Sequence, residues 1–138
     1  MRQPIYLVVG TPGSGKSWVC NQLKEKFKYL PHDEYMNDDL YVKAAARMAG
    51  HYLSPILIET PFSVSKIYEP LLKQGFTVIP VFIIETKQVT TERYEARENK
   101  PIPKGHLSRI NTYVERAREM DAFQGTSEEV LEHLKAVK

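Results

Sequence analysis

Residues 5–17 read Ile5-Tyr6-Leu7-Val8-Val9-Gly10-Thr11-Pro12-Gly13-Ser14-Gly15-Lys16-Ser17, an apolar β-rich run followed directly by the pattern G-x-x-x-x-G-K-[ST]. This pattern is typical of a phosphate-binding loop. Glycine permits backbone conformations closed to other residues, so successive N–H groups can turn inward around a polyphosphate. Lys16 supplies a positive charge for the terminal phosphates, and the Ser17 hydroxyl can ligate Mg²⁺. The helix that begins here directs its positive end at the anion.

The surroundings of the loop favour nucleotide binding over a glycine-rich turn that binds nothing. A buried strand precedes the loop, and Val19, Leu23 and Phe27 follow it at a spacing of four on one helix face. We therefore expect the chain to bind ATP together with Mg²⁺. The residues expected to contact ATP are Gly10, Thr11, Pro12, Gly13, Ser14, Gly15, Lys16, Ser17 and Trp18, together with Arg93 from farther along the chain.

The composition indicates a soluble globular protein, with 42% hydrophobic and 26% charged residues in 138. Its apolar runs are too short to cross a bilayer, and its one cysteine, Cys20, excludes an internal disulfide framework. We expect one domain over residues 1–138, a cytoplasmic location and no membrane association. The net charge is only +2, but residues 87–118 hold eight Lys or Arg against four Asp or Glu. A basic segment of this kind suits the clamping of phosphates, or is merely a solvated surface.

The order of the periodic segments predicts an α/β fold. We expect strands at 5–9, 29–32, 56–58 and 77–84, and helices at 14–28, 41–48, 63 or 65 to 74, 90 or 91 to 98, 108–120 and 127–137. Alternation of this kind predicts a three-layer sandwich, with a parallel sheet of four to five strands covered by helices on both faces. The loop 10–17 indicates that this sandwich is of the P-loop NTPase, kinase type. A clear fifth strand near residues 121–125 is not visible. Thr126 and Glu129 form a capping box that opens the final helix.

Three segments that are distant in the sequence should meet at one edge of this sheet. Gly10, Asp33 and Glu59 each stand where a predicted strand ends, and ligands of such sheets lie beyond the carboxyl ends of the strands. Asp33 is the candidate base that orients an acceptor hydroxyl and accepts its proton, unless it only caps a turn. Asp33 and Glu59, with Ser17, are the candidate ligands of Mg²⁺ or of its water shell. Glu85 ends the fourth strand, but no partner is visible, so we expect a solvated loop acid.

A basic helix and a proline-rich loop predict a lid at about residues 90–118. Arg93 and Arg97 lie four residues apart on one helical face, where guanidinium groups can bind phosphate oxygens and stabilise the transferring phosphoryl group. The alternative is an exposed helix of alternating charges, because Glu92, Glu95 and Glu98 are interleaved with the arginines. The segment 100–106 (KPIPKGH) has the composition of a hinged flap, and a kinase needs such a lid to exclude water.

These motifs together resemble the kinase domain of phage polynucleotide 5′-kinase. The resemblance rests on the loop 10–17, the segment 32–35 (HDEY) and the lid with its two arginines. It implies that Asp33 is the catalytic base, that Arg97 stabilises the transition state, and that Lys16 and Arg93 assist catalysis. In two places the chain departs from the family, because Met36 stands where the family has the arginine that binds the acceptor phosphate, and Glu59 stands where it has an aspartate. The acceptor site has therefore been rebuilt.

The resemblance also extends to small phage kinases that phosphorylate 5-hydroxymethyluracil in DNA. It implies an ATP-dependent kinase acting on a nucleic acid hydroxyl, either such a hydroxymethylated base or a polynucleotide 5′-hydroxyl, in the host cytoplasm if the protein is phage-encoded. Four aromatic residues on the acceptor side could stack on a base or pack in the core, namely Tyr35, Tyr41, Tyr52 and Phe62. The alternatives are a kinase of a free nucleoside, nucleotide or sugar, and a nucleotide-dependent switch or assembly factor.

Overall fold

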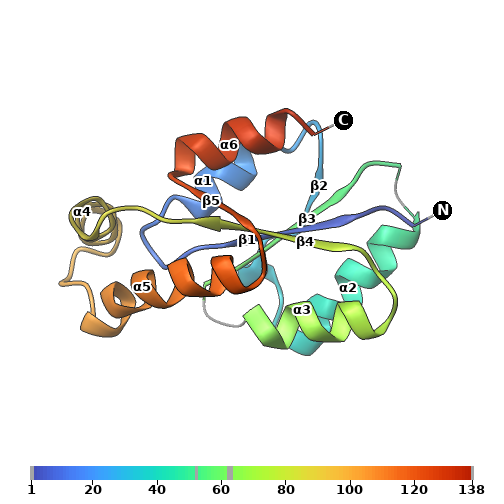
Figure 1. Ribbon diagram of the computed structural model, residues 1–138, viewed down its shortest axis with the longest axis horizontal. Coiled ribbons are helices and arrows are strands. Elements are labelled where there is room, and N and C mark those ends of the chain that lie inside the picture. Colours follow the sequence, from blue (N-terminus) through green and yellow to red (C-terminus); the bar gives the residue numbers. More distant parts are fainter. Residues whose placement is uncertain (1, 52, 62–63, 138) are drawn as a thin grey trace.

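Five parallel strands form a single sheet in a computed structural model that describes residues 2–51, 53–61 and 64–137. The strands are β1 (Ile5–Val9), β2 (Lys28–Tyr29), β3 (Ile56–Thr60), β4 (Val78–Ile83) and β5 (Phe123–Gly125). Their order across the sheet is β2-β3-β1-β4-β5, so β1 lies at the centre (Figure 1). The three central strands are almost continuously apolar because helices cover both of their faces. The α/β fold expected from the sequence is confirmed.

The helices form two layers and one projection. On one face lie α1 (Lys16–Asn21) and α6 (Ser127–Lys135), and on the other lie α2 (Asp38–His51), α3 (Val64–Lys73) and α5 (Lys104–Glu119) (Figure 1). Helix α4 (Lys87–Glu98) stands beyond the carboxyl edge of the sheet, at the left of Figure 1. Within the described ranges, no helix combines the length and the apolar character that crossing a bilayer would need.

Successive side chains of each central strand pack alternately into two separate hydrophobic cores. In β1, Ile5, Leu7 and Val9 pack in the core beneath α2, α3 and α5, whereas Tyr6 and Val8 pack in the core beneath α1 and α6. Val19, Leu23 and Phe27 all lie in the second core, but only Val19 is on α1. The helix expected at 14–28 is wrong in extent, because α1 ends at Asn21 and the chain continues in turns that carry Leu23 and Phe27. Burial on both faces holds the sheet rigid, so the loops at its carboxyl edge keep a defined position.

The element boundaries differ from the expectations in ways that have local causes. The fifth strand exists after all: β5 pairs with β4 through Phe82 and Gln124, but three residues are too few to show an alternating pattern. The expected strand at 29–32 is a two-residue β2 followed by a 3₁₀ turn, η1 (His32–Glu34), which carries Asp33. Helix α4 begins before the expected Thr90 or Thr91, because the Thr86 side chain accepts a hydrogen bond from the N–H of Val89 at 3.1 Å. The capping box of Thr126 and Glu129 is confirmed.

Tyr41 joins α2 to two strands from inside the core. Its side chain is fully buried, and its hydroxyl donates a hydrogen bond to the carbonyl oxygen of Leu30 and accepts one from the N–H of Glu59 at 2.9 Å. Tyr41 is therefore a core residue and not a stacking surface for an acceptor base. Tyr35 packs against it with ring centroids 5.1 Å apart, while Tyr52 and Phe62 lie outside the described residues.

We expect Tyr41→Phe to lower the free energy of unfolding by about 1–3 kcal/mol, since it leaves the Leu30 carbonyl and the Glu59 N–H buried without their partner. Urea denaturation followed by circular dichroism measures the change. A loss below about 0.5 kcal/mol, the size of an ordinary surface effect, would contradict the role given to the hydroxyl.

Candidate active site

The loop 10–17 wraps the start of α1 and needs glycine at two positions. Gly13 and Gly15 have φ angles of +90° and +95°, a conformation that residues with a side chain rarely adopt. A Cβ atom at Gly13 would lie 2.6 Å from the carbonyl oxygen of Thr90, and one at Gly15 would lie 2.9 Å from Nη1 of Arg93. The glycines therefore serve the turn and also let α4 pack directly on the loop.

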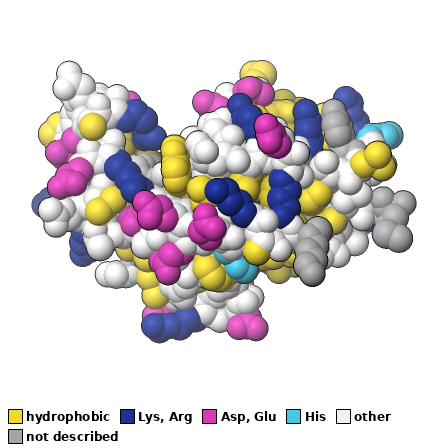
Figure 2. Space-filling view, turned by 90° about the horizontal axis from the view of Figure 1, so that it is seen from above, with side chains coloured by type: hydrophobic (Ala, Val, Ile, Leu, Met, Phe, Trp, Pro, Cys, Tyr) yellow, Lys and Arg dark blue, Asp and Glu magenta, His cyan; other side chains and the backbone are white. Residues whose placement is uncertain are grey.

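Three adjoining recesses run along this loop. The first, of about 260 Å³, is lined by Gly15, Trp18, Arg93, Ser127 and Glu128. The second, of about 230 Å³, is lined by Gly13, Gly15, Lys16, Ser17, Trp18, Arg93 and Arg97. The third, of about 180 Å³, is lined by Lys16, Ser17, His32, Asp33, Glu59 and Pro61. Neighbouring recesses share residues, so together they form one trough. In the view from above, a notch separates the lobe that contains α4 from the body of the molecule (Figure 2).

Lys16 stands at the junction of the second and third recesses, between opposite charges. Burial lowers the pKa of its ammonium group, the nearby carboxylates of Glu59 and Asp33 act in the opposite direction, and the guanidinium of Arg97 adds to the lowering. These influences place Asp33, Glu59 and Arg97 within electrostatic reach of Lys16. The structure thus brings together four predicted site residues, each from a separate segment of the sequence.

Glu59 is held in one orientation by groups from β2 and η1. It lies inside β3, one residue before the strand ends, with only 4% of its surface exposed. Its Oε2 atom accepts a hydrogen bond from the hydroxyl of Tyr29 and another from the backbone N–H of His32 at 3.3 Å. Burial and the hydrogen bond to Glu59 raise the pKa of Tyr29, so the phenol stays protonated and continues to donate.

The side chains of the third recess fit Mg²⁺ in the way that nucleotide sites use it. This ion keeps several water ligands and takes one or two carboxylates together with substrate phosphates. The recess offers the carboxylates of Asp33 and Glu59 and the hydroxyl of Ser17. Within the described ranges, no three His, Cys, Asp or Glu side chains cluster to hold a metal by themselves. The donor set therefore suits an ion that arrives with a nucleotide.

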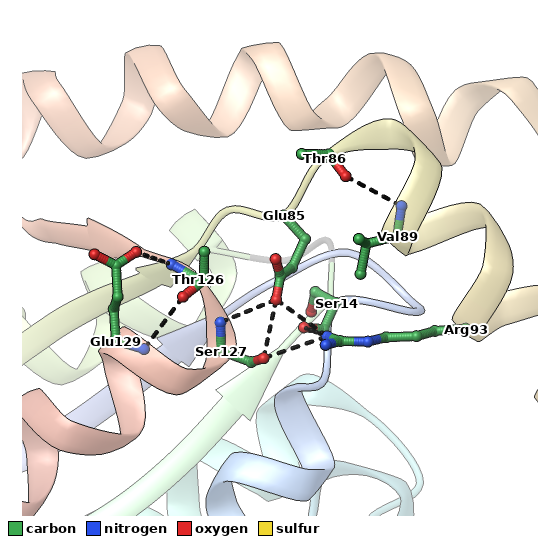
Figure 3. Close-up of polar contacts among 8 residues, drawn as sticks. All are labelled: Ser14, Glu85, Thr86, Val89, Arg93, Thr126, Ser127 and Glu129. Atoms are coloured by element: carbon green, nitrogen blue, oxygen red, sulfur yellow. Dashed lines mark hydrogen bonds and ion pairs between the residues drawn. The ribbon is translucent and has the colours of Figure 1, made fainter.

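Arg93 and Glu85 meet in a polar cluster that the sequence did not predict (Figure 3). Nη1 of Arg93 donates to the carbonyl oxygen of Ser14 at 2.9 Å, to Oε2 of Glu85 at 3.1 Å and to Oγ of Ser127 at 3.3 Å. The same Glu85 oxygen accepts from the N–H of Ser127 at 3.1 Å and from its hydroxyl at 2.9 Å. The expectation that Glu85 is a solvated loop acid is wrong, because the side chain is 8% exposed and has three donors.

The two lid arginines consequently have different environments. Arg93 is fixed to the loop through Nη1, although a guanidinium has five N–H donors and this one still lines two of the recesses. Arg97, one turn later, is 54% exposed, forms a surface ion pair with Glu98 at 3.3 Å and lies over the ring of Tyr94 at 5.8 Å from its centroid. It lines the second recess opposite Lys16. The predicted pair is therefore one anchored arginine and one that can move.

Comparison with known proteins identifies the fold. No family model matches the sequence, and no curated protein matches it significantly. Solved structures that superpose on it include a gluconokinase from Sinorhizobium meliloti 1021 (19% identity, TM-score 0.60, covering 96% of this chain and 90% of that one). A second is the Deinococcus radiodurans tunicamycin resistance protein (16% identity, TM-score 0.65, covering 98% of this chain and 95% of that one). A third is an Acinetobacter baumannii shikimate kinase solved with shikimate (13% identity, TM-score 0.60, covering 96% of this chain and 90% of that one). The chain has the α/β fold of such P-loop kinases, whereas the narrower resemblance to phage polynucleotide kinases stays a prediction.

We expect Glu85→Gln to lower the free energy of unfolding by about 1–3 kcal/mol, because a neutral amide replaces a buried acceptor of charge-assisted hydrogen bonds from Arg93. Chemical denaturation measures the loss. Glu92→Gln, on the exposed side of α4, is the matched control and should change stability by less than about 0.5 kcal/mol. Equal effects of the two substitutions would show that the cluster contributes nothing specific.

Proposed function

We propose that this protein is an ATP- and Mg²⁺-dependent kinase that transfers the γ-phosphoryl group to a hydroxyl of an acceptor. One observation supports this most strongly: a single trough leads from Trp18 and Ser127, past the glycine loop, to a carboxylate floor at Asp33 and Glu59. The first recess suits a nucleoside, the second suits its phosphates, and the third suits the transfer. A site for ATP hydrolysis alone would not require an acid positioned to receive a proton from an acceptor.

In the proposed reaction, one side chain accepts a proton and two others stabilise negative charge. The Asp33 carboxylate accepts the proton of the acceptor hydroxyl, whose oxygen forms a bond to the γ-phosphorus while the bond to the bridging oxygen of ADP breaks. Lys16 and Arg97 offset the charge on the phosphoryl oxygens and on the leaving ADP. Bound Mg²⁺ would neutralise phosphate charge in the same place. Glu59 keeps its orientation through Tyr29 and His32 and positions the ligand shell of the ion.

The acceptor has two candidates. A nucleic acid hydroxyl follows from the resemblance of the segment 32–35 and the lid to phage polynucleotide kinases. A small hydroxylated molecule is supported by the gluconokinase and shikimate kinase whose structures superpose on nearly the whole chain. Transfer assays with both kinds of acceptor distinguish the two candidates.

We expect Asp33→Asn to reduce kcat for phosphoryl transfer at least about 100-fold while the KM for ATP changes little, because the amide cannot accept the hydroxyl proton. The assay follows transfer of label from γ-labelled ATP to an acceptor panel of nucleosides, sugars, sugar acids and oligonucleotides with 5′-hydroxyl or 5-hydroxymethyluracil groups.

Glu34→Gln is the matched control, since Glu34 is exposed on the same 3₁₀ turn. It should leave kcat within about twofold, as a solvated charge outside the trough contributes little. If Asp33→Asn retains full transfer activity, Asp33 is not the base. If ATP is hydrolysed and no acceptor takes the label, the nucleotide-dependent switch becomes the better interpretation.

We expect Glu59→Gln to raise the Mg²⁺ concentration required for half-maximal activity by about 10–100-fold, as is usual when an outer-shell carboxylate is lost. A titration of activity with MgCl₂ at saturating ATP measures the shift. A lower kcat with an unchanged Mg²⁺ requirement would instead assign Glu59 a role in packing or in orienting His32.

A further inference from the structure

A cationic recess lies next to the transfer site, between the first turn of α3 and one face of α5. It measures about 470 Å³, and its lining residues are Val64, Ser65, Lys66, Arg109, Thr112, Tyr113 and Arg116. Three of these residues carry a positive charge, and none of them carries a negative one. The trough for ATP shares none of its lining residues, so this recess is a separate feature of the molecule.

Helix α5 builds one wall of the recess by its periodicity. Arg109, Tyr113 and Arg116 are spaced by four and three residues, which places their side chains on one helical face. Tyr113 is buried, packs edge-on against Phe82 with ring centroids 5.9 Å apart, and thereby fixes this face against the sheet. Nη2 of Arg116 donates to Oγ of Ser65 on α3 at 2.7 Å, so its guanidinium is held at the wall.

The charge of the recess is not balanced by its own lining. Elsewhere on α5, Arg118 pairs with Glu115 at 2.8 Å, and on α4 Arg97 pairs with Glu98. Arg116 instead has a neutral serine as its partner in the part of the chain that the structure describes. Like charges that share a space of this size repel one another, and the positive end of α3 adds to the field. A bound anion would remove this repulsion and take the remaining guanidinium donors.

Pro61 connects the recess to the carboxylate floor. It follows β3 and lines the third recess beside Asp33, and its carbonyl oxygen accepts a hydrogen bond from the hydroxyl of Tyr113. A ligand seated on Tyr113 and the two arginines therefore lies beside the place where Asp33 would receive a proton. The recess thus adjoins the end of the trough that Asp33 and Pro61 line, and not the end lined by Trp18 and Ser127.

We propose that the acceptor carries an anionic group, a phosphate or a carboxylate, which is bound by Lys66, Arg109 and Arg116 and directs the acceptor hydroxyl toward Asp33. This inference rests on the proposed kinase function. It narrows the acceptor to hydroxylated anions, and bidentate binding of an oxyanion by Arg116 is its central contact. Sugar phosphates, hydroxy acids, nucleotides and nucleic acid termini share this chemistry, and the experiment distinguishes among them.

The first test compares acceptors in matched pairs, thymidine with thymidine 5′-monophosphate and glycerol with glycerol 3-phosphate, beside an oligonucleotide with a 5′-hydroxyl. We expect kcat/KM to be at least about tenfold higher for the anionic member of a pair, the gain from one hydrogen-bonded charge. Arg116→Gln should remove that preference and leave the KM for ATP unchanged. Arg118→Gln, the paired arginine two residues later, is the control and should retain the preference. Label in the oligonucleotide alone would identify the anion as a nucleic acid phosphate.

The second test does not depend on transfer. Phenylglyoxal modifies accessible arginines, and peptide mass spectrometry reads the rate at each position. Millimolar inorganic phosphate should slow the modification of Arg109 and Arg116 and leave that of Arg118 unchanged. Preference for neutral acceptors, or a loss in Arg116→Gln that is equal for both members of a pair, overturns the proposal, as does absence of protection. Protection without transfer to any acceptor would retain the anion site and reject the kinase function.

Discussion

The carboxylate of Glu85 is the contact on which the geometry of this site depends. It lies just beyond β4 and accepts from Arg93 of α4 and from both donors of Ser127 at the start of α6, while Arg93 also binds the carbonyl of Ser14 in the glycine loop. Direct hydrogen bonds thereby join four segments of the chain. Because the carboxylate is buried, removing any member leaves charge or donors unpaired in a medium of low dielectric constant. This cluster explains why the loop, the lid helix and the nucleoside end of the trough keep a common position.

The same cluster limits which part of the lid can move. Thr90 and Tyr94 are buried against the glycine loop, and on α5 the side chains of Ile110, Tyr113 and Ala117 are buried in the core. Displacing these residues would expose apolar surface. The connection between the two helices, residues 99–103, contains two prolines and carries no such burial. If the protein closes over a nucleotide as proposed, the movement would be confined to the end of α4, residues 99–103 and the start of α5, a shorter segment than the lid expected at about residues 90–118.

What the sequence could predict is what neighbouring residues determine. The strand before the loop, the burial of Val19 on the first helix and the capping box at Thr126 depend on residues within a few positions, and the structure confirms them. The carboxyl-edge rule also brought Asp33 and Glu59 to the loop lysine. Glu85 was misjudged because one of its partners, Ser127, is 42 residues away. The recess at Arg116 was missed for the same reason, since Ser65 is 51 residues distant and only the fold brings the first turn of α3 beside α5.

The distribution of charge at the carboxyl edge argues for a site built around two anions. At the floor, the carboxylates of Asp33 and Glu59 outnumber the Lys16 ammonium, so the metal ion of a bound triphosphate would offset their charge, while Lys16 and Arg97 would face the phosphates. On the other side of Pro61, three cations line a recess that has no carboxylate in its lining. The first anion would be the triphosphate of ATP, which the reaction converts to ADP. The second would be the anionic group of the acceptor, which is bound but not changed by the reaction. An acceptor bound through its anionic group would not need its hydroxyl for binding. The hydroxyl would therefore be available to donate its proton to Asp33, as the proposed reaction requires.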